Sequence, residues 1–338
     1  MKNAEWPSVN SVIAGAYDNL LSPMVLFFAL GFLAGRLQSD LKIPEGISKG
    51  LALYLMLAIG FRGGVELSHN SISGIMLMSL ISAILISLII PAIGYFLLRK
   101  TTSLDIPNAA AISAHYGSVS VVTFAAATAF LKGQGVSFEP YIIALMALME
   151  TPAIVSGLLL ARRREKSLQK GGSHLFSREV LREVFLSGSV IILLGSFVIG
   201  LLTGDRGMDI LGAVVERPFR GLLCIFLLDM GLLASQRFSG SERFGFRLIS
   251  FGFYMPLIGA SIGLLAGKLL GLSVGGSTLM AVLAASASYI VVPAAMRVAL
   301  PQANPAFYVT LALGITFPFN LVLGIPLYHA IARMFIGS

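Results

Sequence analysis

The chain has few charged residues and a single cysteine. Only 12% of its 338 residues are Asp, Glu, Lys or Arg, whereas 56% are hydrophobic. This balance excludes a soluble globular domain, in which about a quarter of the residues are charged. The one cysteine, Cys224, permits no disulfide within the chain. It lies in an apolar segment, so we expect it to be a small buried hydrophobic residue.

The motifs of nucleotide hydrolysis and of metal-dependent catalysis are also absent. The sequence has no Walker A pattern, no HExxH pattern and no Cys and His residues at metal-ligand spacing. Residues 271–275 match the GxSxG pattern, but they begin an apolar stretch and do not follow a strand, as a hydrolase nucleophile would. The sequence therefore predicts that the chain is not an enzyme and does not pump with ATP on its own. An intramembrane enzyme is the alternative, but nothing in the sequence pairs a nucleophile with a base.

Apolar segments take up most of the chain, whose mean hydropathy is +0.87. A helix that crosses a bilayer needs about 20 mostly apolar residues. Ten segments fit this description, at 20–37, 44–66, 73–98, 107–131, 138–161, 187–204, 217–236, 244–270, 275–300 and 305–334. The sequence predicts an all-α polytopic membrane protein with ten transmembrane helices.

The positive charge is unevenly distributed between alternate loops. The longest basic run lies in 162–186, the one long polar stretch. If this stretch is cytoplasmic, both termini lie outside and 16 of the 24 Lys and Arg residues lie on the cytoplasmic side, as the positive-inside rule requires. The eight cations expected outside are Lys2, Arg62, Lys132, Arg206, Arg217, Arg220, Lys268 and Arg333. The net charge of +8 thus indicates membrane topology and not a nucleic-acid interface.

The two sides of this basic stretch resemble each other. Residues 49–60 are similar to residues 220–231, and segments five and ten each contain a proline past their middle, Pro152 and Pro318. We therefore expect a first repeat at 1–161, a cytoplasmic linker at 162–186 and a second repeat at 187–338. Because each half has an odd number of spans, the halves must have opposite orientations. This is the inverted repeat of many secondary transporters.

Two serines one residue apart occur in segment four and again, 168 residues later, in segment nine. The pairs are Ser118 with Ser120 and Ser286 with Ser288. Gly117 weakens the helix at the first pair, and Pro293 does so after the second. We predict that both segments are broken, so that free backbone amides and hydroxyls surround a site for a small oxyanion. The alternative is that each hydroxyl only bonds to the carbonyl four residues earlier.

Ionisable and amide side chains inside the membrane are the other candidates. Glu150, just before Pro152, and Asn320, just after Pro318, are the candidate Na⁺ ligands, because freed carbonyls and carboxylates suit a hard cation. Either could instead form a structural bond to a neighbouring helix. Supporting roles fall to Asp229, His115 and Tyr289, of which His115 could be purely structural.

Glycines recur at four-residue spacing in segment eight, and shorter glycine pairs occur in other segments. They are Gly259, Gly263, Gly267 and Gly271, with Gly31/Gly35, Gly60/Gly64 and Gly200/Gly204 elsewhere. Small residues at this spacing allow helices to approach closely. The pattern predicts packing, within a protomer or between protomers.

Several stretches resemble the SbtA-type family of sodium-dependent bicarbonate transporters. They are IPE at 43–45, ETP at 150–152, AASASYIVVPAAMR at 284–297, LPQANP at 300–305 and GITFPFN at 314–320. The resemblance covers nearly the whole chain and is strongest over 275–330. Two stretches differ from the cyanobacterial members, which read more like GAVSGS where this chain has HYGSVS, and more like MDIP where it has METP.

The resemblance implies ten helices in a 5+5 inverted repeat, Na⁺-coupled bicarbonate uptake across a bacterial inner (plasma) membrane, and a homotrimer. It implies elevator motion of a core domain (helices 3–5 and 8–10) against a gate domain (helices 1, 2, 6 and 7). It places bicarbonate between the broken helices, at Gly117, Ser118, Ser120, Ser286, Ala287 and Ser288. No organic cofactor is expected. Cyanobacterial members are regulated by a PII-like protein on the cytoplasmic side, which makes such a partner an option here.

Three other functions remain open at this point. A Na⁺/H⁺ antiporter of similar build would use Asp229 or Glu150 as an alternately protonated carboxylate. A symporter could carry another small organic anion, since both departures from the cyanobacterial pattern fall on the expected site. A receptor with a transporter-like fold would bind a solute without moving it.

Overall fold

The computed structural model describes residues 21–69, 73–162, 188–238, 245–289, 292–293, 295–296 and 300–336. Within these ranges the regular structure is helical throughout. The predicted linker at 162–186 lies, beyond its first residue, outside the described residues, and so does most of the basic run on which the predicted sidedness depends.

The helices follow the predicted segments in order. They are α2 (Pro23–Arg36), α3 (Glu45–Ser68), α4 (Gly74–Thr101), α5 (Ile106–Gly117), α6 (Val121–Gly133), α7 (Ile142–Arg162), α9 (Gly188–Val215), α10 (Phe219–Phe238), α11 (Phe246–Leu270), α12 (Val274–Ala285), α14 (Pro305–Val309), η3 (Thr310–Thr316), α15 (Phe317–Phe319), η4 (Asn320–Gly324) and α16 (Ile325–Ile336). Eight of the described stretches are long and apolar enough to cross a membrane, and α2 and α12 are apolar but shorter. The all-helical polytopic class is confirmed, whereas ten spans and the inverted repeat stay predictions.

The predicted end of segment six, at residue 204, falls on an interruption of α9. Gly204 takes φ 53° and ψ −140°, a non-helical backbone conformation that favours glycine. The helix that crosses from Gly188 therefore stops at this glycine, and a second helical stretch follows it as far as Val215.

Side-chain caps fix where several described helices begin. In each case an oxygen accepts a hydrogen bond from an amide in the first turn, which would otherwise lack a partner. The capping residues are Ser22 for α2, Ser73 for α4, Asp105 for α5, Ser120 for α6, Ser273 for α12 and Asn304 for α14.

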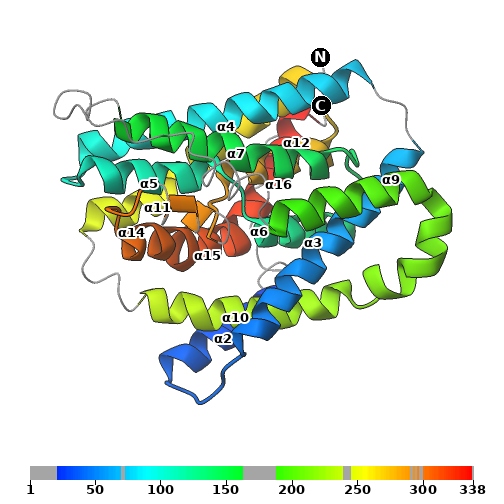
Figure 1. The fold of residues 1–338 in the computed structure, drawn as a ribbon, viewed down its shortest axis with the longest axis horizontal. Coiled ribbons are helices and arrows are strands. Elements are labelled where there is room, and N and C mark those ends of the chain that lie inside the picture. Colours follow the sequence, from blue (N-terminus) through cyan, green and yellow to red (C-terminus); the bar gives the residue numbers. More distant parts are fainter. Residues whose placement is uncertain are drawn as a thin grey trace.

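Glycines let two helix pairs pack backbone to backbone, as their spacing predicts. A Cβ on Gly31 of α2 would lie 2.0 Å from the carbonyl oxygen of Leu228 in α10, and one on Gly64 of α3 would lie 1.9 Å from that of Phe197 in α9. Only glycine fits at such distances. Figure 1 shows α2, α3, α9 and α10 on one side of the molecule, and α4, α5, α7, α11, α12 and α14 to α16 mostly on the other.

The glycines of segment eight serve two purposes. A Cβ on Gly259, Gly263 or Gly267 would collide with α12, so this face of α11 packs within the chain. Gly271 instead ends α11 in the left-handed conformation, with φ 69°. The glycine face thus holds α12, and with it the second serine pair, against α11.

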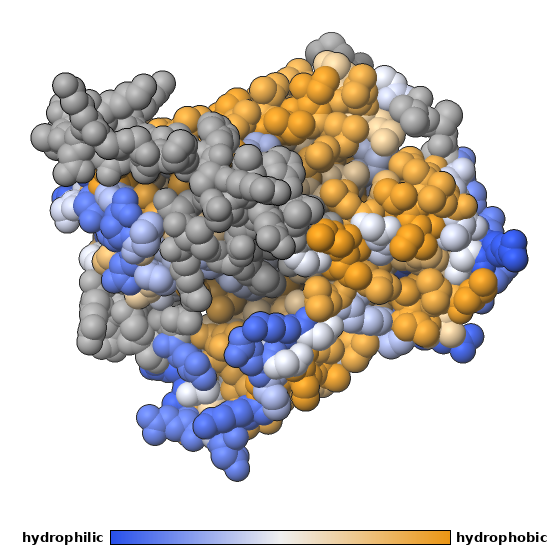
Figure 2. All heavy atoms as spheres, in the orientation of Figure 1, coloured by the Kyte–Doolittle hydropathy of each residue, from blue (hydrophilic) through white to orange (hydrophobic). Residues whose placement is uncertain are grey.

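Large apolar side chains remain exposed along α4. They include Leu77, Met78, Ile81, Leu85 and Ile89. In Figure 2 hydrophobic side chains cover the upper middle of the view, along part of α4, while hydrophilic side chains gather at the left-hand, lower and right-hand margins. Large apolar side chains exposed along the length of a helix are typical of a surface that faces lipid.

Helices α5 and α12 correspond residue for residue. Both contain 12 residues, and adding 168 to the bounds of α5 gives the bounds of α12. The same offset joins their capping residues, Asp105 with Ser273 and Ser118 with Ser286. It is also the spacing of the two serine pairs, so the sequence similarity extends to local structure.

Candidate substrate and ion site

The first serine pair interrupts a helix, as predicted. Helix α5 ends at Gly117, Ser118 to Ser120 are extended, and α6 begins at Val121. The Ser120 hydroxyl accepts a hydrogen bond from the Thr123 amide at 3.2 Å and so caps α6. Gly117 is required here because a Cβ would lie 2.2 Å from Cγ of Pro91 in α4. The break is therefore built into the packing of α4 against α5.

The second serine pair interrupts α12 in the same way. The helix ends at Ala285, and Ser286 is extended, with φ −82° and ψ 165°. The Ser286 hydroxyl donates to the carbonyl oxygen of Leu283, and the Ser288 hydroxyl accepts from the Val292 amide at 3.4 Å. Neither bond runs to the carbonyl four residues earlier, so that alternative does not describe this pair.

The two extended segments cross and bond to each other. The Ser120 amide donates to Oγ of Ser286 at 3.0 Å, and the Ser288 amide donates to the carbonyl oxygen of His115 at 2.9 Å. All four serines are buried, with exposed fractions of 4% or less. We call this meeting of residues 118–120 and 286–288 the crossing. It brings together the six residues predicted for the anion, including Gly117 and Ala287.

Three polar groups at or next to the crossing are buried without a hydrogen-bond partner among the described residues. They are Oγ of Ser118, Nε2 of His115 and the Tyr289 hydroxyl, and Oε2 of Glu150 in α7 is a further such group. The Tyr289 hydroxyl lies near Ser120 but outside hydrogen-bond geometry. A buried polar group left unpaired costs about 1–3 kcal/mol. Unsatisfied donors and acceptors in one place are typical of a site that a ligand completes.

His115 is held by its surroundings. Its Nδ1 lies 2.6 Å from the carbonyl oxygen of Ala111, and its ring stacks on Tyr308 at 4.3 Å between ring centroids. Because a carbonyl only accepts, Nδ1 carries the proton. The ring is thereby fixed beside the crossing, and its Nε2 has no hydrogen-bond partner among the described residues. Tyr308 was not predicted, since nothing in the sequence indicates this stacking.

Glu150 is buried in α7, with an exposed fraction of 2%. The helix continues through Pro152. The carbonyl oxygen of Met149, its neighbour, accepts a hydrogen bond from the Ser87 hydroxyl of α4. Pro152 has no amide hydrogen, so it cannot donate to the carbonyl oxygen of Leu148 four residues earlier, in the turn that contains Glu150.

Both the nitrogen and the oxygen of the Asn320 side-chain amide form hydrogen bonds. Its Nδ2 donates to the carbonyl oxygen of Ala285 at 2.9 Å, and its Oδ1 accepts from the Tyr328 hydroxyl at 2.8 Å. Ala285 is the last residue of α12, so Asn320 holds the end of this helix at the crossing. The stretch around Asn320 is π-helical, in η3 and η4, and such turns are frequent at functional sites.

Asp229 is buried in α10, and its Oδ2 has no partner among the described residues. Its carboxylate interacts with Ser48 of α3. This interaction links it to α3, and no hydrogen bond or ion pair among the described residues joins it to the crossing.

Two further ties join the halves and were missed from the sequence. The Asn304 amide donates to Oδ1 of Asn108, near the start of α5, at 2.7 Å. The Ser273 amide, at the start of α12, donates to Oε1 of Glu139 at 2.7 Å, and its hydroxyl donates to Oε2 at 3.0 Å. Each interrupted helix is thus held at its start by a loop of the other half. The one sequence signal for these ties is the spacing of the capping residues Asp105 and Ser273, which lie 168 residues apart and mark the starts of the two helices.

A third polar link connects α5 to the last helical stretch. The Thr316 hydroxyl donates to the carbonyl oxygen of Gly252 at 2.8 Å, so the Tyr116 hydroxyl must donate to Thr316, at 2.6 Å. All three residues are buried. This chain of bonds ties α5, α11 and η3 together beside the crossing.

Two interrupted helices that cross within a bundle of membrane-spanning length define a polytopic helical membrane protein of the transporter class. A family model described as the Na⁺-dependent bicarbonate transporter superfamily matches residues 23–333. The chain belongs to this superfamily, which confirms the resemblance noted in the sequence. No curated protein matches the chain.

Proposed function

We propose that the protein is a secondary symporter that takes up bicarbonate together with Na⁺ by elevator-type alternating access. The observation that carries the proposal is the crossing, where two interrupted helices place four serines and free helix ends in one buried place. Broken helices in corresponding positions are the usual site of solute and ion binding in inverted-repeat transporters. Bicarbonate and Na⁺ follow from the family to which the chain belongs.

The anion would bind to neutral donors at the crossing. In the first turn of α6 the Thr123 and Phe124 amides bond to Ser120. This leaves the Val121 and Val122 amides as donors without an intrahelical acceptor. The positive end of the helix dipole points at the same place. The hydroxyls of Ser118 and Tyr289 have no partner among the described residues. Ser286 and Ser288 hold the two segments in register, since each bonds across the crossing. A small oxyanion accepts several hydrogen bonds and fits this set of donors.

Na⁺ would bind to oxygens beside the anion. Glu150 offers a carboxylate oxygen without a partner among the described residues, and the carbonyl oxygen of Asn320 retains a second lone pair. The described residues contain no group of three or more His, Cys, Asp or Glu side chains that could hold a metal ion. A site built mainly from neutral oxygens suits a weakly bound monovalent cation that must be released.

The helix packing supports a division into two moving parts. Helices α2, α3, α9 and α10 would form the gate domain. The core domain, which carries the crossing, would consist of α4 to α7, α11, α12 and α14 to α16. The proposal includes ten spans, repeats at 1–161 and 187–338, both termini outside and a cytoplasmic 162–186 linker. The homotrimer and a PII-like partner on the cytoplasmic side rest on the family resemblance alone.

Purified protein in sealed proteoliposomes tests this function. An inward Na⁺ gradient should drive accumulation of ¹⁴C-bicarbonate, and an equal K⁺ gradient should not. Equilibration of bicarbonate without Na⁺ dependence would exclude coupling. Accumulation of acetate or formate in preference to bicarbonate would identify a symporter of a different small anion. Binding without flux would identify a receptor.

A Na⁺/H⁺ antiporter is the second candidate, because two acids are buried with an unpartnered oxygen, Glu150 and Asp229. Such carboxylates could release a proton when Na⁺ binds. In the same vesicles, with a pH dye inside and no bicarbonate added, antiport predicts a Na⁺-driven rise or fall in internal pH. Symport predicts no pH change under these conditions.

A further inference from the structure

A cavity lies away from the crossing, between the helices assigned to the two domains. Its volume is about 270 Å³, and it is lined by α3, α6, α7 and the connection between α9 and α10. Since a water molecule takes up about 30 Å³, the cavity has room for a small ion together with part of its hydration shell. We call this cavity the vestibule.

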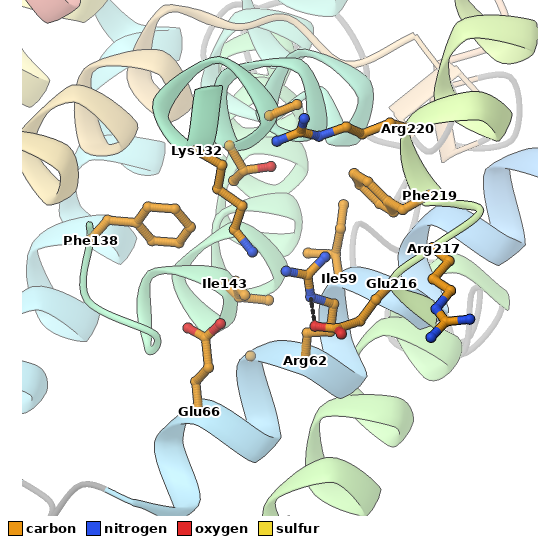
Figure 3. A pocket seen from close by; sticks show the side chains of 13 residues that line it. Ile59, Arg62, Glu66, Lys132, Phe138, Ile143, Glu216, Arg217, Phe219 and Arg220 are labelled. Atoms are coloured by element: carbon orange, nitrogen blue, oxygen red, sulfur yellow. Dashed lines mark ion pairs between the residues drawn. The ribbon is translucent and has the colours of Figure 1, made fainter. Parts of the chain in front are cut away.

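Charged side chains surround the vestibule, as Figure 3 shows. Lys132 extends into it from the end of α6, Arg62 and Glu66 from α3, and Arg220 from the start of α10, while the Arg217 guanidinium turns away toward the rim. The lining holds four cations, Arg62, Lys132, Arg217 and Arg220, and two carboxylates, Glu66 and Glu216, so its net charge is +2.

Three of the four cations, Lys132, Arg217 and Arg220, form no ion pair with a carboxylate of the described residues. Arg62 forms an ion pair with Glu216, with Nε 3.8 Å from Oε1. Neither Lys132 nor Arg220 forms an ion pair with a described residue, although Lys132 lies within electrostatic range of Arg62, Arg220, Glu66 and Glu216. Both side chains are exposed, so they face water and can meet a dissolved anion.

The vestibule is connected to the crossing by a single helix. Helix α6 begins at Val121, directly after Ser120, and Lys132 lies in its last turn. At a rise of 1.5 Å per residue, Lys132 is about 16 Å from the crossing along the helix. The lining cations all belong to the set that the charge distribution places outside, which is the side from which an uptake system receives its substrate.

We propose that the vestibule is a second anion site, where Lys132 and Arg220 collect a small monovalent oxyanion before it moves along α6 to the crossing. The inference rests on the proposed function and adds a capture step to it. A cleft lined by charge of one sign raises the local concentration of the opposite ion and its rate of association. Unlike the crossing, this site binds through charge, so salt should weaken it.

The test compares kinetics of ¹⁴C-bicarbonate uptake at fixed Na⁺. The variant Lys132→Gln/Arg220→Gln should raise the half-saturating bicarbonate concentration about 10-fold at low ionic strength, the lower end of the range that electrostatic steering supplies. Its maximal rate should not change, since the crossing is intact. With 1 M choline chloride the difference from wild type should vanish, because the Debye length falls to about 3 Å.

Two matched variants control for folding and for overall charge. Lys132→Arg/Arg220→Lys keeps both charges and should behave as wild type. Arg206→Gln/Lys268→Gln removes two cations that are expected on the same side but do not line the vestibule, and it too should keep the wild-type half-saturation.

The possible results separate the two proposals. Suppose that wild type takes up bicarbonate with Na⁺, but that Lys132→Gln/Arg220→Gln and Arg206→Gln/Lys268→Gln have the same half-saturating bicarbonate concentration. The vestibule proposal is then wrong and the symporter proposal stands. A loss of maximal rate without a change in half-saturation would also overturn the vestibule proposal. If wild type shows no Na⁺-dependent uptake, both proposals fail.

Discussion

The backbone amide of Ser120 donates a hydrogen bond to the hydroxyl of Ser286, over a distance of 3.0 Å. This one bond joins the interruption between α5 and α6 to the interruption after α12. The two serines lie in different halves of the chain, so neither half can complete this arrangement alone. Loss of either interruption would remove the crossing.

Replacement of Ser286 by alanine should destabilise the protein and lower uptake. The buried Ser120 amide would lose its acceptor, which costs about 1–3 kcal/mol. A lower thermal unfolding midpoint in detergent measures the effect. Ser261→Ala is the matched control, because Ser261 bonds only to the carbonyl of Leu257 in its own helix. Equal midpoints for both variants would show that the bond to Ser120 does not stabilise the crossing.

Replacement of Gly117 by alanine should reduce the amount of folded protein. The new Cβ would lie 2.2 Å from Cγ of Pro91 and 2.8 Å from the carbonyl oxygen of Ser87, so α4 and α5 would have to separate. Overpacking of this kind costs about 1–3 kcal/mol. Gly46→Ala should be neutral or stabilising, since no atom lies within 4 Å of its Cβ position. Size-exclusion profiles after mild heating compare the two, and a Gly117→Ala profile like that of wild type would contradict the close contact.

Replacement of Glu150 by glutamine should raise the Na⁺ concentration needed for half-maximal uptake. Loss of one charged ligand worth about 1.4 kcal/mol corresponds to a tenfold change. Uptake is measured against Na⁺ at saturating bicarbonate, with Glu45→Gln as the control because this carboxylate is exposed and pairs only with Lys49. An unchanged Na⁺ dependence would remove Glu150 from the ion site.

Uptake should not respond to the membrane potential if one Na⁺ accompanies each bicarbonate. A net charge that crossed the whole membrane would gain about 2.3 kcal/mol per 100 mV, which is more than a tenfold effect on accumulation. Potassium gradients with valinomycin set the potential in proteoliposomes. Accumulation that increases with an inside-negative potential would require more than one Na⁺ per anion.

The sequence predicted those features that depend on local chemistry. Apolar length predicted the helices, and glycine, proline and paired serines predicted the break at Gly117 and the end of α12 at Ala285. Spacing of small residues predicted the close packing at Gly31 and Gly64. These signals are local because a helix end or a close backbone contact depends on the residues of a single turn.

Long-range contacts could not be predicted in the same way. Nothing in the residues around Glu139 indicates that its carboxylate accepts hydrogen bonds from Ser273. The stacking of His115 on Tyr308 is equally impossible to predict from the sequence. The position of Asn320 after Pro318 predicted an ion ligand, but it did not reveal the bonds of its amide to Ala285 and Tyr328. The vestibule was missed because Lys132 and Arg220 meet only when α6 and α10 approach each other.

The most direct measurement of the anion site is bicarbonate uptake by Ser118→Ala. The hydroxyl of Ser118 has no partner among the described residues, so its removal should leave the unfolding midpoint unchanged. A hydrogen bond to a charged group is worth about 1.5–3 kcal/mol, so the half-saturating bicarbonate concentration should rise tenfold or more. Ser113→Ala, in the helix that ends just before Ser118, should have no effect, because the Ser113 hydroxyl bonds to the carbonyl of Ala109 in its own helix. Wild-type uptake by Ser118→Ala would show that bicarbonate does not bind at the crossing.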